Sequence, residues 1–417
     1  MNCLCNHLAH RRQVLAGGAA LAASTALSGC FATNPATGER SFVGSMDEKS
    51  EIQAGAEYHP QVLNEFGGEY DNARVRGYVR DLGMTMASKS ERPSLKWTFT
   101  VLNSDIVNAF AVPGGYVYIT RGTLALADTE AEMAGVIGHE IGHVTALHTP
   151  QRFGKQQAAG ILTTLGAIGV GILTGSGQAA QMAGDIGQTL SGSLLASYSR
   201  EHEMEADRLG VRYLARNGWE PFGVAKFLEK LGNDTRLQAI MAGKDPAIVE
   251  QTHMMSTHPR TSDRVNALSG AARAASAPNQ KVNKDEYLRA IDGITYGDDP
   301  AQGIVKGTRF VHPDLRFAFD APEGFKLVNT PSAVQGQGRN ALMIFGLDPK
   351  GKGVEPQRYL AANRMAALEP MNVNGLPAAT GLAQGQVGNT AADIRVVAIA
   401  DGDKMYRFQF AVPRGGM

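Results

Sequence analysis

The spacing of apolar and polar positions divides the first part of the chain into helical and strand-like stretches. Apolar side chains three and four positions apart predict helices over residues 47–66 and 72–89. Alternation of apolar and polar side chains instead predicts strands over residues 95–102 and 116–120. Helical spacing returns in residues 136–148, whose sequence is VIGHEIGHVTALH. This half of the chain is therefore predicted to be mainly helical with a small β-sheet.

The stretch 136–148 carries the first candidate chemistry. His139 and His143 are one helical turn apart, so both imidazoles point to the same side of the helix. The H-E-x-x-H pattern supplies two zinc ligands, and Glu140 can take a proton from a water on that metal. The alternative is a solvated surface helix with a chance motif. Because glycine weakens a helix interior by roughly 1 kcal/mol, we expect another element to pack closely at three glycines: Gly135, Gly138 and Gly142.

A later charged stretch, residues 198–210, is predicted to complete the metal site. A catalytic zinc ion usually has three protein ligands and keeps a fourth position for water. Glu203 and Asp207 are four positions apart and share a helix face, so one can bind the metal while the other hydrogen-bonds a ligand histidine. On spacing alone, Glu201 and Glu205 compete for these roles, and a solvated charged helix is the alternative.

Between these two stretches the chain is unusually apolar and rich in glycine. Residues 158–175 carry no charge over eighteen positions, which is the lower limit for crossing a bilayer. Their five glycines make a poor membrane span. We therefore expect this segment, with residues 179–197, to form a mobile hairpin that packs over the active site or dips into the membrane surface. A transmembrane helix is the alternative.

The segment 108–120 is the candidate for substrate binding. An exposed edge strand can bind an extended peptide by adding it to the sheet as one more strand. An internal hairpin with both edges paired is the alternative. The residues predicted to contact substrate are Asn108, Ala109, Gly115 and Tyr116.

The N-terminus has the features of a bacterial secretory signal. Arg11 and Arg12 precede an apolar, alanine-rich run that ends in Leu-Ser-Gly-Cys at Cys30. The last four residues resemble a lipoprotein cleavage box, and the paired arginines resemble a twin-arginine signal. We therefore predict a signal peptide over residues 1–29, export by the Sec or the twin-arginine route, and lipidation of Cys30. Residues 30–46 would then form a polar tether from a membrane surface.

Composition sets bounds on the rest of the chain. A chain of 417 residues can hold two domains, each with its own core. The 40 basic residues equal the 40 acidic residues, so no nucleic-acid partner is indicated. We predict a metal-binding domain over residues 47–270 and a linker over residues 271–305, which begins with a stretch rich in Ala, Ser and Pro.

Residues 306–417 are predicted to form a small α+β domain of unknown role, without a catalytic constellation. Residues 355–369 have helical spacing. Four stretches alternate as strands: 315–319, 341–345, 396–399 and 406–410. The predicted fold class of the whole chain is α+β.

Together, these motifs resemble one known family. H-E-x-x-H on one helix, E-x-x-x-D within S-R-x-x-E-x-E-A-D-x-x-G on a later helix, and a downstream Ser-Thr-His-Pro look like the metallopeptidase family of HtpX and the CAAX prenyl proteases. Within it, the soluble periplasmic lipoprotein branch that includes BepA and LoiP is most similar, because N-P-x-T-G in the tether also matches. The resemblance covers about residues 34–267 and implies a zincin-like metalloprotease domain.

The resemblance also implies roles for individual residues. Glu140 would be the base, and Asp207 would hydrogen-bond a ligand from outside. His258 matches the family's mobile histidine, which can lie over the metal or stabilise the oxyanion, and Arg264 matches its companion arginine. The implied ligands of one Zn²⁺ per chain are His139, His143 and Glu203.

The predicted function is that of a zinc-dependent endopeptidase of the bacterial cell envelope, anchored by lipid in the periplasm at the outer membrane. The resemblance implies misfolded or stalled envelope proteins as substrates and the outer-membrane assembly machinery as a partner. The alternative is a chaperone-like assembly factor whose zinc site is mostly closed by His258 and the glycine-rich hairpin. Glu140 separates the two predictions, because a binding module does not need a general base.

Overall fold

The structure is a computed structural model. The predicted signal peptide and the apolar segment 158–175 lie outside the residues that it describes. The described residues are 30–155, 198–241, 258, 262–330, 333–387 and 390–416.

The chain divides into two compact units. The first contains residues up to 60, residues 71–101 and residues 106–294. The second contains residues 295–417 together with two short segments, 61–70 and 102–105. The first unit is mainly helical with a small sheet and the second is rich in β-strands, so the predicted α+β fold class is confirmed.

Two helices of the first unit begin and end close to their predicted positions. Residues 47–66 were expected to be helical, and α2 covers Glu48–Glu65. In the same way, α3 covers Ala73–Ser88, starting after an Asn72 cap that accepts a hydrogen bond from Val75 N. Further helices of this unit are α4 (Arg121–Leu126), α5 (Glu130–Thr145), α8 (Arg200–Asn217), α9 (Gly223–Met241), α11 (Ser262–Ala275) and α12 (Lys284–Ile291).

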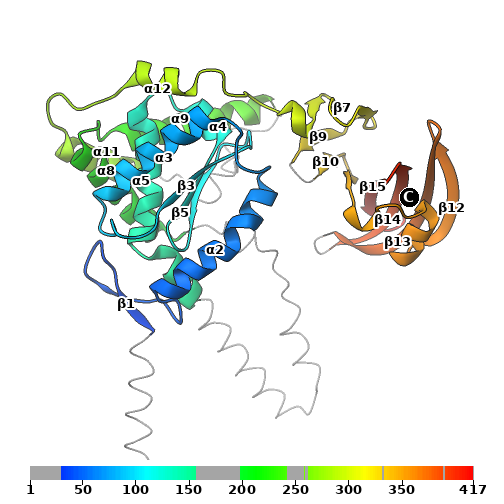
Figure 1. Cartoon of the computed structure of the whole chain (residues 1–417), viewed down its shortest axis with the longest axis horizontal. Coiled ribbons are helices and arrows are strands. Elements are labelled where there is room, and N and C mark those ends of the chain that lie inside the picture. Colours follow the sequence, from blue (N-terminus) through cyan, green and yellow to red (C-terminus); the bar gives the residue numbers. More distant parts are fainter. Residues whose placement is uncertain are drawn as a thin grey trace, which may run out of the picture. The chain divides into compact units, whose positions relative to one another are not determined.

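Helix α5 is the centre of the first unit, and it carries the H-E-x-x-H motif. Thr129 caps its N-terminus by accepting a hydrogen bond from Glu132 N. Every residue from Ala131 to Thr145 is buried, because α3, α8, α9 and strand β4 (Ala109–Val112) all pack against this helix (Figure 1). The alternative of a solvated surface helix is therefore wrong.

The glycines of α5 allow this close packing, as expected. A Cβ atom added at Gly142 would lie 3.0 Å from Ala206 O, and one at Gly135 would lie 2.8 Å from Val224 N. Helix α8 contributes a glycine of its own, since a Cβ at Gly210 would lie 3.2 Å from His139 N. The backbones of α5 and α8 therefore approach one another closely, which brings the charged face of α8 to the histidines.

A three-stranded sheet lies beside α5 in the first unit. Its order is β3-β5-β4, with β3 at Thr98–Leu102 and β5 at Tyr116–Thr120. Strand β4 pairs antiparallel with β5 and, among the residues described, with no other strand. The strand predicted over residues 116–120 has the bounds expected. The β4–β5 hairpin has one edge without a strand partner among the described residues, so the alternative of a hairpin with both edges paired does not hold.

The predicted polar tether forms a folded hairpin instead. Strand β1 (Phe31–Thr33) pairs antiparallel with β2 (Arg40–Phe42), and the rings of Phe31 and Phe42 meet edge to face with centroids 5.4 Å apart. Asn34 and Val43 are only 3% and 2% exposed. The aromatic pair and these buried positions explain why the segment is ordered.

The predicted linker over residues 271–305 also contains folded elements. Helix α11 continues to Ala275, and α12 covers Lys284–Ile291. Tyr287 is fully buried, and its hydroxyl donates to Leu124 O over 2.6 Å. An alanine-rich composition is compatible with a helix as well as with a linker, and burial of Tyr287 fixes α12 on the first unit.

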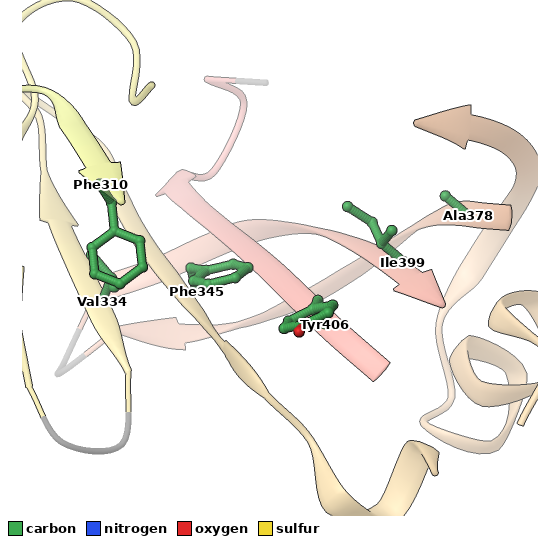
Figure 2. Close-up of a cluster of buried hydrophobic side chains, with 6 residues drawn as sticks. All are labelled: Phe310, Val334, Phe345, Ala378, Ile399 and Tyr406. Carbon is green, nitrogen blue, oxygen red and sulfur yellow. The ribbon is translucent and has the colours of Figure 1, made fainter. Parts of the chain in front are cut away.

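The second unit contains two sheets. A seven-stranded sheet has the order β12-β13-β14-β15-β11-β10-β9, and a smaller sheet has the order β6-β7-β8. Figure 2 shows part of its core, with Phe345 and Tyr406 on the neighbouring strands β11 and β15 and Phe310 on β7. The strands are β6 (Ile304–Lys306), β7 (Arg309–His312), β8 (Phe317–Asp320), β9 (Lys326–Asn329), β10 (Val334–Gln337), β11 (Leu342–Leu347), β12 (Ala366–Val373), β13 (Leu376–Val387), β14 (Thr390–Asp401) and β15 (Lys404–Pro413). The short helices are η2 (Pro300–Gln302), η3 (Pro349–Gly351) and α13 (Pro356–Ala362).

The predicted helix over residues 355–369 is wrong in its second half. Helix α13 ends at Ala362, Arg364 adopts a φ of 58°, and β12 begins at Ala366. A left-handed residue ends a helix because its backbone cannot continue the right-handed turn.

No helix within the described part of the chain has the length and apolar character needed to span a bilayer.

Candidate metal centre

Four side chains from three parts of the chain gather around one point. His139 and His143 come from α5, Glu203 from α8, and His258 from the chain before α11. Each offers one nitrogen or oxygen atom, and these four atoms lie within 4.8 Å of one another. All four residues are at least 96% buried. The structure thus brings together the three predicted ligands and the predicted mobile histidine.

The distances between the donor atoms fit a tetrahedral metal ion. Ligands about 2.0–2.1 Å from a tetrahedral zinc lie roughly 3.3 Å from one another. The Nε2 atoms of His139 and His143 are 3.0 Å apart, and the Glu203 carboxylate lies 3.4 Å from His143 Nε2 and 3.6 Å from His139 Nε2. His258 Nδ1 lies 3.2 Å from His139 Nε2 and 2.9 Å from Glu203 Oε1. Nitrogen and carboxylate donors in this arrangement are suited to zinc.

Asp207 and Arg264 hold the ligands from behind. Asp207 Oδ1 lies 2.9 Å from His139 Nδ1, as expected for a carboxylate that orients a ligand histidine. Arg264 donates through Nε and Nη2 to the two oxygens of Asp207, over 2.6 and 2.8 Å. Its Nη1 lies 2.7 Å from Glu203 Oε2 and donates to His258 O over 3.2 Å. The guanidinium of Arg264 therefore holds both carboxylates, Asp207 and Glu203.

Burial and charge set the protonation of this centre. Burial would raise the pKa of Glu203, but the His258 charge, hydrogen bonds from His143 and His258, and Arg264 bring that pKa well below its ordinary value. Burial holds the pKa of His143 well below its ordinary value. A carboxylate and a neutral imidazole are the forms that bind a metal.

Glu140 lies next to the cluster in the state expected of a base. Its side chain is fully buried, and burial raises the pKa of its carboxyl above the ordinary value. Neither carboxylate oxygen has a hydrogen-bond partner among the described residues. The nearest ionisable group is His258, whose Nε2 lies 3.6 Å from Glu140 Oε1.

The structure separates the competing acidic residues of α8. Glu203 faces the donor cluster, whereas Glu201 is exposed to solvent. Glu205 is half-buried, and its Oε2 lies 3.3 Å from His148 Nε2. Spacing along one helix could not make this choice, because it depends on which face of α8 meets α5.

The predicted substrate-binding residues lie along the β4–β5 hairpin. Asn108 and Ala109 lie at the start of β4, 1% and 0% exposed, and both amide atoms of Asn108 lack a hydrogen-bond partner among the described residues. Gly115 lies in the turn with a φ of 85°, and the Tyr116 ring lies 5.4 Å from that of His59. Of these four residues, only Ala109 therefore lies on the unpaired edge strand, and Asn108 directly precedes it.

Two residues near the cluster had no role predicted from the sequence. The ring of Tyr198 stacks on that of His143 with centroids 3.9 Å apart, and its hydroxyl lies 2.8 Å from Thr149 Oγ1. His148 is fully buried, and its Nδ1 lies 2.9 Å from His143 Nδ1. A histidine five residues after the motif was a visible signal for the second of these, but its partner depends on the fold.

Several known proteins are similar in sequence to this chain. Residues 73–272 match the model of peptidase family M48. The chain is 32% identical over 226 residues to a Beta-barrel assembly-enhancing protease of Yersinia pestis, covering 53% of this chain and 44% of that protein. It is 31% identical over 240 residues to the protein of the same name from Escherichia coli, covering 57% and 47%. It is 33% identical over 147 residues to the Mitochondrial metalloendopeptidase OMA1 of Arabidopsis thaliana, covering 35% and 28%. The chain thus matches less than half the length of each of these relatives.

Proposed function

We propose that this chain is a zinc-dependent endopeptidase, because residues 73–272 match the model of peptidase family M48. The observation that carries the proposal is the buried set of four donor atoms beside the Glu140 carboxylate, which has no hydrogen-bond partner in the described part of the chain. A zinc ion held there would act as a Lewis acid and lower the pKa of a water molecule. His139, His143 and Glu203 would hold the ion.

The chain's own residues would handle the proton and the substrate. Glu140 would accept a proton, and burial raises the pKa of its carboxyl above the ordinary value, which makes its carboxylate a stronger base. The substrate backbone pairs with the edge of β4 that has no strand partner among the described residues, beside Asn108, whose buried amide atoms have no hydrogen-bond partner there either. His258 takes the fourth donor position in the structure, so it must move before a substrate can be cleaved.

That closed arrangement favours the second candidate function, an assembly factor that binds envelope proteins without cleaving them. The names of the bacterial relatives refer both to assembly and to a protease. For this chain we propose that unfolded or misfolded proteins of the bacterial envelope are substrates, and that the outer-membrane assembly machinery is a partner.

The test compares wild-type protein with Glu140→Gln. Zinc content is measured after purification, and cleavage of a denatured outer-membrane protein is followed on gels. We expect one zinc ion in each protein and cleavage by wild type alone, because the amide cannot accept the proton. Glu201→Gln is the matched control, since this exposed residue lies on α8 outside the donor cluster. Equal cleavage by Glu140→Gln contradicts the enzyme proposal, and cleavage by neither protein favours the assembly factor.

We also propose that the chain is attached to the outer membrane, in the periplasm, through a lipid on Cys30. The support is the Leu-Ser-Gly-Cys sequence and the absence of Asp after the cysteine, where Phe31 stands. Cys30→Ser should move the protein from the membrane fraction to the soluble periplasmic fraction. Retention of that variant in the outer membrane would contradict the proposal.

A further inference from the structure

Asn34 is a polar residue of the β1–β2 hairpin that is buried against the metal-binding unit. It is 3% exposed, and a buried amide is stable only with hydrogen-bond partners. Its Oδ1 accepts from Ala36 N over 2.8 Å, within the hairpin. Its Nδ2 donates to Glu205 Oε1 over 2.9 Å, although the two residues are 171 positions apart. The hairpin therefore has a specific polar contact with α8.

Glu205 continues this contact toward the metal centre. Its other oxygen, Oε2, lies 3.3 Å from His148 Nε2. The opposite nitrogen of His148, Nδ1, lies 2.9 Å from Nδ1 of the ligand His143. His148 and His143 are both fully buried, so water does not compete for these bonds. Asn34, Glu205 and His148 thus form a series of contacts that links the hairpin to the ligand His143.

The direction of each hydrogen bond follows from the ligand atom. His143 Nε2 faces the donor cluster, 3.0 Å from His139 Nε2, so its lone pair binds the metal and its proton is on Nδ1. This proton can only be donated to His148 Nδ1, which places the proton of His148 on Nε2. That proton is donated to Glu205, whose second oxygen accepts from Asn34. One assignment of protons therefore satisfies every group in the series.

The hairpin is also held in place by packing. Val43, just after β2, is 2% exposed. A Cβ atom added at Gly154 would lie 2.7 Å from Val43 C and from Gly44 N. Gly154 belongs to the helical residues 148–155, which begin at His148. The same helical segment thus carries His148 at one end and contacts the hairpin at the other.

We propose that His148, Glu205 and Asn34 are positioning residues that fix the orientation of His143. By this route, the N-terminal hairpin is a structural part of the metal centre and not a passive spacer. The proposal rests on the proposed zinc site and goes beyond it, because it concerns how one ligand is held. Residues that orient a zinc ligand from outside typically change metal affinity by about 10–100-fold.

The test measures the dissociation constant for zinc by competition with a chelator, using the complete mature chain. Glu205→Gln should weaken zinc binding by about 10–100-fold, because a glutamine has one acceptor oxygen and cannot accept from both His148 and Asn34. Asn34→Ala should weaken it by about tenfold, at the lower end of that range. The matched controls are Glu201→Gln on the same helix and Glu39→Gln on the same hairpin, both exposed, and both should bind zinc as wild type does.

A ring ¹⁵N spectrum of the zinc-loaded protein tests the proton assignment directly. We expect His148 to carry its proton on Nε2 in wild type. Wild-type zinc affinity in Glu205→Gln and Asn34→Ala, or a proton on Nδ1 of His148 in wild type, would overturn the proposal. If Glu205→Gln does not fold, the affinity of Asn34→Ala decides the outcome. Zinc affinity and the position of the His148 proton are measured without any cleavage assay. A protein that binds zinc normally but does not cleave a substrate would therefore contradict the proposed function and leave this proposal intact.

Discussion

Arg264 is the residue on which the charges of the metal centre depend most. It is 2% exposed and pairs with both Asp207 and Glu203. Burial would lower the pKa of its guanidinium, but these carboxylates raise it. Arg264→Met leaves two buried carboxylates without their cation, and breaking a buried pair costs about 3–5 kcal/mol. We expect a loss of that size in the free energy of unfolding of the zinc-free protein, measured with denaturant.

Arg80→Met is the control for this prediction. The Arg80 side chain is 63% exposed and pairs with its neighbour Asp81 at 2.9 Å. Exposed pairs of this kind contribute about 0–1 kcal/mol. If both variants lose the same stability, the buried clamp is not the reason for the effect of Arg264→Met.

At the scale of residues, the sequence predicted the parts of the centre that depend on local spacing. His139, Glu140 and His143 lie within one helix, so a period of 3.6 residues sufficed to place them. The contacts of Arg264 were not predictable in this way, because Asp207 is 57 positions away. The role of Asn34 needed a pairing over 171 positions. Such pairings depend on how whole elements pack.

The crossing of α5 and α8 sets the metal geometry at the scale of elements. Gly210 lies where α8 meets the backbone of His139. Gly210→Val would push α8 away and carry Glu203 with it, so we expect zinc affinity to fall by about tenfold or more. Competition with a chelator measures this change. Gly270→Ala is the control, because Gly270 is exposed on α11 and nothing lies within 4 Å of a Cβ atom added there. This variant should stabilise the protein by about 0.5–1 kcal/mol.

The contact between α8 and the helical residues 148–155 predicts a pH effect. The ring of His202 stacks on that of His148 with centroids 4.3 Å apart, and burial, with the charges of His148 and Lys155, lowers the pKa of His202 to about 4. Between pH 6.5 and 4 the unfolded chain binds a proton here that the folded chain does not, so stability falls as the pH falls. His202→Gln should reduce this fall by about 1–2 kcal/mol, allowing for partial exposure. Denaturant unfolding at pH 7 and pH 4.5 measures it, and an unchanged pH dependence would contradict the assignment.

The elements of the second unit show which signals were readable and which were not. Residues 366–373 carry apolar side chains at spacings compatible with a helix, and only the left-handed Arg364 and the pairing with β13 make them a strand. A signal for that pairing was present, since Asn374-Gly375 joins β12 to β13 with φ values of 51° and 88°. Asn-Gly between two strands is a strong hairpin signal.

At the scale of the whole molecule, the described metal centre belongs to one unit. Its ligands, Glu140, Asp207 and Arg264 all lie in the first unit. The second unit has a core of its own around Phe310, Phe345 and Tyr406. A short segment, residues 295–302, is bound to residues 61–70 and 102–105, for example through Asn103 Nδ2 donating to Asp299 Oδ2 over 2.6 Å. A cut between the units must keep this segment with the first.

This division predicts the behaviour of a chain that ends at Gly303. The shortened chain keeps η2 and its hydrogen bonds to residues 61–70 and 102–105, and it loses the strands from β6 onward. We expect it to bind one zinc ion with wild-type affinity and to cleave a small denatured protein within about twofold of the wild-type rate, because no ligand or base is removed. Residues 304–417 expressed alone should unfold cooperatively without zinc, as a unit of this size can bury its own core. Loss of cleavage with zinc still bound would instead mean that the second unit captures the substrate. Loss of zinc itself would contradict the independence of the first unit.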